Sequence, residues 1–301
     1  MANSVQRRRL IVTADDFGLT RGVNAAVVLA HREGIVTAAS LMTTGPAFES
    51  AVALAKTNPG LDVGLHFNLT EGRPASDPMD VPSLATPDGF RYNHPLGLAI
   101  AIVQERVRVA DLEREIPSQC ERMLNSGLRI SHVDGHKHVH VIPVVRRLLG
   151  TVLPDYGVKA IRKVIERMPG LRSLLFKNYR TCAQVFEQYM FAKMVAAIWR
   201  QPPFVTPDYF YGITQTGFLD FGAFANIVHD LKGGISELMC HPGYADAELD
   251  RMPTRLRSQR ESELELLTSA EVRDLLSRSG VELIGYTELV GALPMNDCKQ
   301  L

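Results

Sequence analysis

The sequence LIVTADDFG at residues 10–18 decides the fold, because it joins a short apolar strand to two adjacent carboxylates. Leu10–Thr13 has the composition of a buried strand, and a helical pattern follows from about Gly22 to Arg32. A strand that passes through a turn into a helix is the first half of a β-α-β unit. Asp15 and Asp16 then lie at the carboxyl end of that strand, at the edge where α/β proteins assemble their active sites.

The same alternation of strand and helix continues along most of the chain. Further strands are expected at Val36–Met42, Asp62–Phe67, Ile130–Val133, Val158–Ile161, Tyr209–Ile213, Ile235–Met239 and Val281–Ile284. Helices are expected at Ala47–Lys56, Val144–Leu153, Phe218–Leu231 and Ser269–Ser277. Repeated units of this kind predict parallel strands with right-handed crossovers, and seven or eight of them favour a closed barrel over an open sheet. We therefore expect an α/β fold, a divergent TIM-like (β/α) barrel, as a single domain over residues 1–291.

Two stretches interrupt this rhythm. Asn68–His94 is long and rich in proline, and a loop of that length inside a compact domain is either functional or a sign of missed elements. Lys163–Asp208 has helical patterns, including Gln184–Trp199, but little strand signal, so we expect a helical excursion from the barrel at 163–208. Residues 292–301 are expected to form a loose tail.

The composition excludes several classes of protein. The chain has 301 residues, of which 46% are hydrophobic, so a disordered protein is excluded. The 33 Lys and Arg balance the 33 Asp and Glu, which argues against a nucleic-acid partner. Arg7–Arg9 is too short a cluster to change that, and we expect it to be a solvated tail. No stretch approaches the roughly 18 apolar residues of a transmembrane span, and four scattered cysteines without a CxxC pair favour a reducing, cytoplasmic location.

Histidine is concentrated in one place. The stretch HVDGHKHVH at residues 132–140 holds four of the nine histidines, directly after a predicted strand. Imidazoles at close spacing are a common metal-ligand pattern, and Asp134 could orient one of them by accepting its second ring N–H. A polar turn that is rich in histidine by chance is the alternative. His66 and His241 each close another predicted strand. A lone histidine in the position of His66 is more often an ordinary hydrogen-bonded residue than a ligand, whereas His241 by itself favours neither interpretation.

Together these features indicate more than each does alone. The two aspartates and the histidines all follow parallel strands, so they should converge on one edge of the barrel. A divalent cation would relieve the repulsion between the buried carboxylates. One aspartate and two histidines would leave coordination positions open, as in catalytic rather than structural sites. The residues therefore predict a mononuclear metal hydrolase.

Four motifs in this sequence resemble those of the YdjC-like carbohydrate deacetylases, a family that includes chitooligosaccharide deacetylases and the hopanoid-associated HpnK branch. They are TADDFG at 13–18, GLH at 64–66 with NLTEGRP at 68–74, HVDGHKHVH at 132–140, and ELMCHPGY at 237–244. They occur in the family's order and span nearly the whole chain. The excursion at 163–208 matches the family poorly, which leaves the substrate contacts there undefined.

The resemblance implies roles for particular residues. Asp16, His66 and His136 correspond to the metal ligands. Asp15 corresponds to the catalytic carboxylate that acts as the base, and His241 to the acid that protonates the departing amine. Arg162, at the end of a predicted strand, matches the family's strand-end arginine, and we expect it to stabilise the oxyanion.

Further expectations complete the site. We predict substrate contacts from Asn68, Glu71 and Arg73 of the second motif. Around the ligands we expect supporting contacts from Asp134, His138 and His140. One divalent metal ion is implied, with Mg²⁺ first on the resemblance and Zn²⁺ as the alternative on ligand softness.

The implied reaction removes the acetyl group from an N-acetylated sugar, either an oligosaccharide or a glycolipid head group. Another barrel metal hydrolase, a phosphoesterase or amidohydrolase, is the first alternative, but these typically have a His-x-His pair where Asp15 and Asp16 stand. A sugar-binding protein without catalysis is the second, although both the base and the acid are present. A homodimer through the excursion at 163–208 is one assembly that the sequence allows.

Overall fold

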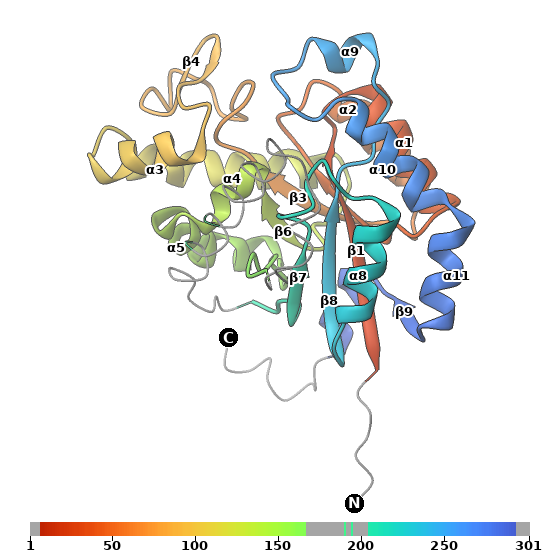
Figure 1. Cartoon of the computed structure of the whole chain (residues 1–301). Coiled ribbons are helices and arrows are strands. Elements are labelled where there is room, and N and C mark those ends of the chain that lie inside the picture. Colours follow the sequence, from red (N-terminus) through yellow and green to blue (C-terminus); the bar gives the residue numbers. More distant parts are fainter. Residues whose placement is uncertain (1–6, 167–189, 191–193, 195–203, 293–301) are drawn as a thin grey trace, which may run out of the picture.

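A computed structural model describes residues 7–166, 190, 194 and 204–292, and shows a parallel sheet flanked by helices (Figure 1). The strands of the sheet are β1 (Arg8–Phe17), β2 (Ala38–Leu41), β3 (Asp62–Phe67), β6 (Val133–Gly135), β7 (Tyr209–Tyr211), β8 (Gly234–Cys240) and β9 (Val281–Leu283). They lie in the order β6-β3-β2-β1-β8-β7, and β9 pairs with the start of β1. Every pair is parallel, so the carboxyl ends of all seven strands face the same edge.

The predicted closed barrel is confirmed only as a curled parallel sheet. The strand expected at Val158–Ile161 is reduced to isolated bridges, which pair Ile161 with Val133 and Ala160 with Val205. A left-handed turn at Gly157 precedes this segment, and the buried, charged Arg162 follows it, so few residues remain for a regular ladder. The two edges of the sheet, β6 and β7, are therefore not joined by a regular strand among the described residues.

Most of the helices lie side by side along the outer face of the curled sheet (Figure 1). Their bounds are α1 (Arg21–Arg32), α2 (Phe48–Lys56), α3 (Pro95–Val103), α4 (Val109–Asn125), α5 (Pro143–Val152), α8 (Phe221–Asp230), α9 (Ala247–Asp250), α10 (Ser258–Thr268), α11 (Ala270–Arg278) and α12 (Tyr286–Gly291), with 3-10 turns η1 (His136–Val141) and η2 (Leu153–Tyr156). The start of α1 shows how local sequence sets these bounds, because the Thr20 side chain accepts a hydrogen bond from Val23 N and caps the helix.

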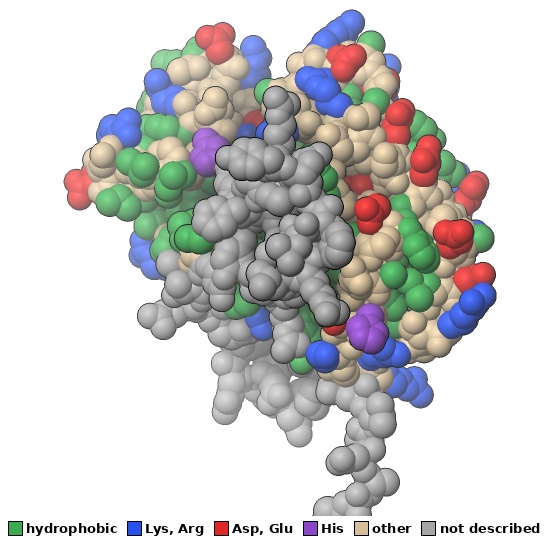
Figure 2. Space-filling view, viewed as in Figure 1, with side chains coloured by type: hydrophobic (Ala, Val, Ile, Leu, Met, Phe, Trp, Pro, Cys, Tyr) green, Lys and Arg blue, Asp and Glu red, His purple; other side chains and the backbone are tan. Residues whose placement is uncertain are grey.

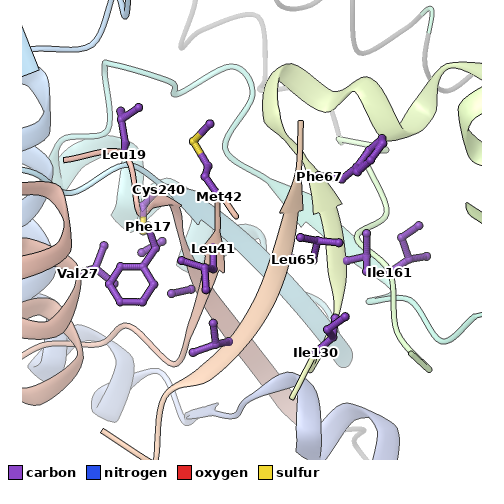
Figure 3. Close-up of a cluster of buried hydrophobic side chains, with 14 of the residues drawn as sticks. Phe17, Leu19, Val27, Leu41, Met42, Leu65, Phe67, Ile130, Ile161 and Cys240 are labelled. Carbon is purple, nitrogen blue, oxygen red and sulfur yellow. The ribbon is translucent and has the colours of Figure 1, made fainter. Parts of the chain in front are cut away.

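The core lies between the sheet and the helices (Figure 3). Phe17, Leu41 and Leu65, from three adjacent strands, are fully buried, and Val27 of α1 packs in the same cluster. The central strands are buried on both faces, as expected of a parallel sheet covered by helices. This packing makes the carboxyl edge of the sheet a rigid platform.

The long loop predicted at Asn68–His94 is tied down by one face of α4. It contains a small hairpin, β4 (Ala85–Thr86) and β5 (Gly89–Phe90). Asp111, Glu115 and Gln119 lie four residues apart on α4 and are all buried. Their side chains accept backbone N–H groups of the loop, at 2.8 Å from Ser83 and Ala75 and at 3.0 Å from Asn68. The loop is therefore an ordered part of the domain, and α4, which the sequence analysis did not identify, is what orders it.

One face of α3 is apolar and open to solvent. Leu96, Ile100 and Val103 are 56%, 44% and 83% exposed, and Figure 2 shows hydrophobic side chains gathered over this lobe. Within the described part of the chain, no helix combines the length and apolar character that a bilayer crossing requires.

Most of the predicted excursion at 163–208, including the helical pattern at Gln184–Trp199, lies outside the described residues, as does nearly all of the tail at 292–301. The division into one domain with an excursion and a tail therefore stays a prediction.

Gly64 of β3 provides a test of how tightly the sheet is packed. A Cβ atom at Gly64 would lie 2.4 Å from the ring of His132, which is itself stacked on Tyr286 at 3.8 Å. We expect Gly64→Ala to lower the free energy of unfolding by about 1–3 kcal/mol, measured by urea denaturation. Gly97→Ala is the control, because a Cβ there meets nothing within 4 Å and alanine favours the α3 helix by about 0.5–1 kcal/mol. Equal stability of Gly64→Ala and the wild type would contradict this packing.

Candidate active site

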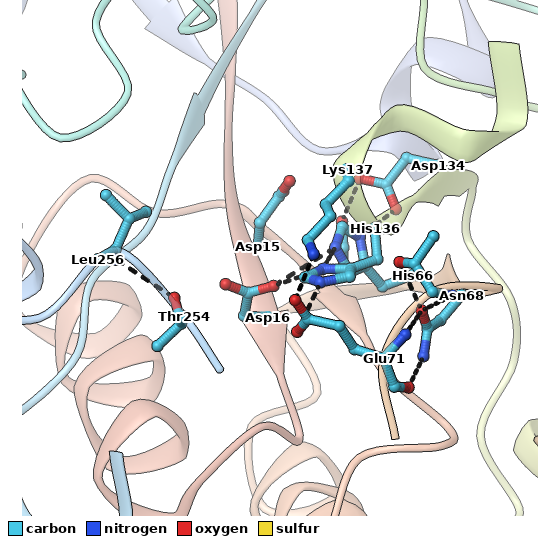
Figure 4. A network of polar contacts seen from close by, with 12 residues as sticks. Asp15, Asp16, His66, Asn68, Glu71, Asp134, His136, Lys137, Thr254 and Leu256 are labelled. Carbon is cyan, nitrogen blue, oxygen red and sulfur yellow. Dashed lines mark hydrogen bonds and ion pairs between the residues drawn. The ribbon is translucent and has the colours of Figure 1, made fainter. Parts of the chain in front are cut away.

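The two carboxylates at the end of β1 face the same site because the strand is irregular there. Successive side chains of a regular strand point to opposite faces. The pairing of β1 with β2 shifts register between Ala14 and Phe17, and Asp16 has a positive φ of 64°. This local distortion brings both Asp15 and Asp16 to the carboxyl edge of the sheet (Figure 4).

Asp16, His66 and His136 bring three donor atoms together at this edge (Figure 4). His136 Nδ1 lies 3.1 Å from Asp16 Oδ1 and 3.3 Å from His66 Nε2, and His66 Nε2 lies 3.5 Å from Asp16 Oδ1. All three residues are buried. The structure therefore assembles the residues that the sequence predicted as metal ligands, from β1, β3 and the start of η1.

The second ring nitrogen of each histidine faces a carboxylate. His66 Nδ1 donates to Asp134 Oδ1 at 2.8 Å, whereas the sequence led us to expect Asp134 beside a histidine of its own stretch at 132–140. His136 Nε2 lies 3.1 Å from Glu71 Oε2, and Glu71 also pairs with Lys137. Carboxylates in these positions fix the ring orientation and the tautomer of a metal-binding histidine. The donor set and its supporting carboxylates fit a bound divalent cation.

Arg162 is the hub of a buried ion-pair network. Its guanidinium donates to both oxygens of Asp15 at 2.7 Å and, through Nε, to Glu237 Oε1 at 2.9 Å. It also pairs with Asp134, so one fully buried arginine joins carboxylates from β1, β6 and β8. With its nitrogens directed at carboxylates, Arg162 orients Asp15, while its predicted contact with an oxyanion stays a prediction.

Negative charge exceeds permanent positive charge around the donors. The ion pairs here join five carboxylates to three cations: Asp15, Asp16, Glu71, Asp134 and Glu237 on one side, Arg162, Arg260 and Lys137 on the other. Burial disfavours the charged form of His66, yet Asp134 and Asp16 raise its pKa to about 10. A protonated His66 imidazole supplies one of the two missing positive charges, and a divalent cation in the same place would supply both.

Asp16 itself remains ionised. Burial would raise the pKa of Asp16, but Arg260 and the hydrogen bonds from His136 and His66 hold it well below its usual range. Arg260 Nη2 donates to Asp16 Oδ2 at 2.5 Å, on the oxygen that the histidines do not contact.

His241 follows β8 and is 9% exposed. Burial lowers the pKa of His241 to about 4, although Asp15 and Asp16 act to raise it. Its imidazole is therefore neutral at neutral pH. Its backbone N–H donates to Glu263 Oε2 at 2.6 Å, which fixes the chain just after the strand.

The predicted substrate residues divide by exposure. Asn68 is fully buried, donating from Nδ2 to Thr44 Oγ1 at 2.9 Å and to the Glu71 carbonyl at 2.6 Å. These contacts shape the turn that presents Glu71 to His136. Arg73 is exposed on the same turn. Substrate contacts of the three residues stay predictions.

The remaining histidines of the 132–140 stretch pack around the site. His138 and His140 lie with ring centroids 6.1 Å apart, and His138 is 6.3 Å from Phe210, whose ring also faces Arg162 at 5.6 Å. Lys137 and His138 have positive φ values of 50° and 58°, so the chain turns sharply directly after His136.

Three residues that contact the site, Arg260, Glu263 and Ser40, were not predicted from the sequence. Ser40 Oγ donates to Asp134 Oδ2 at 2.9 Å. Arg260 and Asp16 are 244 positions apart, and no motif surrounds Arg260. Glu237, which contacts Arg162, does lie inside the quoted motif at 237–244, so that motif could have indicated it.

Comparison with known proteins adds to this geometry. The sequence profile of the YdjC-like protein family matches residues 9–278. A carbohydrate deacetylase of Brevibacillus brevis is 34% identical, with 93% of this chain and 99% of that protein covered. Carbohydrate deacetylases of Geobacillus stearothermophilus and Homo sapiens are 35% and 32% identical, over 93% and 96% of this chain and 98% and 93% of those proteins.

A solved structure shares the fold. It comes from Enterococcus faecalis, is named for cellobiose-phosphate cleavage, and superposes with a TM-score of 0.69 at 25% identity. The match covers 94% of this chain and 99% of that one.

The donor assignment can be tested with the metal alone. We expect His136→Ala to lose zinc after incubation and desalting, measured by elemental analysis, because only two of the three donors remain. The loss should exceed the roughly 10–100-fold drop in affinity typical when only a supporting residue is changed. His229→Ala, at an exposed position on α8, is the matched control and should retain the metal. Wild-type zinc content in His136→Ala would refute the assignment.

Proposed function

Because this chain belongs to the family of YdjC-like proteins, we propose that it is a carbohydrate N-deacetylase, a hydrolase that cleaves the amide bond of an N-acetylated sugar. The curated relatives named carbohydrate deacetylase match it over nearly their whole length. The observation that carries the proposal is the three-donor cluster beside Asp15, whose two oxygens are held by Arg162. The products would be acetate and an amino sugar.

Asp16, His66 and His136 would hold the metal ion. When bound, a divalent cation supplies a Lewis acid that activates water and polarises the acetyl carbonyl. The resemblance to the family puts Mg²⁺ first, whereas two imidazole donors favour Zn²⁺. Both ions therefore belong in any assay.

Asp15 is proposed as the general base. Arg162 fixes its carboxylate through two hydrogen bonds of 2.7 Å, so the base cannot rotate away from the site. This orientation matters because a general base must lie within hydrogen-bond reach of the proton that it removes.

His241 is proposed as the group that returns a proton to the leaving nitrogen. Since burial lowers its pKa to about 4, His241 must first gain a proton before it can act as an acid. Hydrolysis provides one, because the attacking water gives its hydroxyl to the acetyl carbon and its proton to the amine. We propose that this proton leaves the water to Asp15 and reaches the amine through His241.

Other expectations remain with the proposal. A neutral sugar suits a chain without net charge, since such a substrate needs no electrostatic steering. The expected substrate is either an oligosaccharide or a glycolipid head group. A cytoplasmic location and a homodimer are predictions of the sequence.

The activity is tested by acetate release from N-acetylated mono- and oligosaccharides and an N-acetylated glycolipid. We expect release with added Mg²⁺, Zn²⁺ or Mn²⁺ and none with EDTA, because the donor cluster requires a cation. Phosphate release from phosphorylated sugars without acetate release would instead support a phosphoesterase. Sugar binding without any product would support a binding protein.

The proposed roles of Asp15 and Asp16 can be distinguished by replacing each residue with asparagine. Asp15→Asn should lower kcat by about 10²–10⁴-fold and keep the metal, because Arg162 retains Asp134 and Glu237 as partners. Asp16→Asn should lose the metal together with activity. Metal content and initial rates measured on both variants give the comparison, and an Asp15→Asn enzyme within tenfold of wild type would remove Asp15 as the base.

A further inference from the structure

Helix α10 carries two buried charged side chains on one face. Arg260 and Glu263 are 1% and 2% exposed and lie three residues apart, so they project from the same side of the helix. Charged side chains are rarely buried without a partner. Each of these two has its partner in the site at the carboxyl edge of the sheet.

Arg260 contacts the proposed metal ligand directly. Its Nη2 donates to Asp16 Oδ2 at 2.5 Å, whereas Asp16 Oδ1 faces His136 Nδ1 at 3.1 Å. The guanidinium is held from behind as well, because Nε donates to the Leu256 carbonyl at 3.2 Å. The two oxygens of one carboxylate therefore have different partners, one an arginine and the other the donor cluster.

The loop after β8 is shaped to let Arg260 pass. A Cβ atom at Gly243 would lie 2.9 Å from Cδ of Arg260, and Gly243 N donates to the Arg260 carbonyl at 3.2 Å. Glu263 accepts the backbone N–H of His241 at 2.6 Å in the same loop. Helix α10 thus fixes this loop through Glu263 and contacts Asp16 through Arg260.

We propose that Arg260 is a positioning residue that occupies one oxygen of Asp16 and so limits what Asp16 offers to a metal ion. The proposal rests on the metal site of the proposed function. With Oδ2 engaged, only Oδ1 is presented beside the two histidines, and further coordination positions stay open for water and substrate. The charge of Arg260 also opposes a cation at the donors, so the site binds its metal less tightly than the same three donors would alone.

A merely structural arginine would behave differently. Loss of a structural ion pair weakens the fold and with it the metal site, so metal affinity and activity would fall together. Loss of an opposing charge raises metal affinity, while activity falls because Asp16 no longer leaves the same positions open. Tighter binding combined with slower turnover is therefore the signature of the proposed role.

The test is calorimetric titration of metal-stripped protein with Zn²⁺ and, separately, with Mg²⁺. We expect Arg260→Gln, whose shorter and neutral side chain releases Asp16 Oδ2 and removes the opposing charge, to bind the metal about tenfold more tightly than wild type. Arg260→Lys keeps the charge and should bind like wild type. The matched control is Arg257→Gln, because Arg257 precedes the same helix but pairs with the exposed Asp250 at 2.9 Å, away from the donors.

Gly243→Ala gives an independent route to the same result if Arg260→Gln does not fold, because the added methyl displaces Arg260 without deleting it. It too should bind the metal more tightly. Unchanged or weaker affinity in the folded variants would overturn the proposal, as would a wild-type protein that takes up neither ion. Acetate release by the wild type reports separately on the proposed function, so the two can fail independently.

Discussion

One buried arginine holds together three of the carboxylates on which the site depends. Arg162 pairs with Asp15, Asp134 and Glu237, which come from three different strands of the sheet. Carboxylates cannot be gathered away from water unless opposite charge is gathered with them, and removal of one partner from a buried pair typically costs about 3–5 kcal/mol. These contacts therefore tie Asp15, the Asp134 that orients His66, and strand β8 into one unit.

Backbone irregularity performs the complementary task of aiming side chains. Among the described residues, four that are not glycine have positive φ, and three of them, Asp16, Lys137 and His138, lie in two of the three motifs that build the donor cluster. Such conformations cost of order 1 kcal/mol or more each and persist where the surroundings impose them. In a regular β1, the side chains of Asp15 and Asp16 would point to opposite faces of the sheet. The positive φ values of Lys137 and His138 turn the chain sharply directly after His136. The strain is thus concentrated where two carboxylates and two imidazoles must converge.

Helices α4 and α10 hold the loops that surround the donor cluster. Polar residues on one face of α4 hold the long loop that presents Glu71 to His136. Helix α10 places Arg260 on Asp16 and Glu263 on the His241 backbone. Both helices use hydrogen bonds from buried polar side chains to fix parts of the chain that are distant in sequence. The catalytic edge is consequently enclosed by elements from both halves of the chain.

The sequence by itself determined the parallel α/β fold and the convergence of Asp16, His66 and His136, because apolar strands are recognisable locally and parallel strands end at a common edge. It indicated that Asp134 orients an imidazole, but not that this imidazole belongs to His66 on another strand. It did not reveal that the segment at 158–161 forms no regular strand. Nor did it show that the Asn68 side chain forms hydrogen bonds within a turn, or that Arg162 pairs with three carboxylates. Nor did it reveal Arg260, which lies in a helix without a motif, 244 positions from Asp16. Such partners are chosen by which buried charges come within hydrogen-bond distance after folding, and only the tertiary structure decides that.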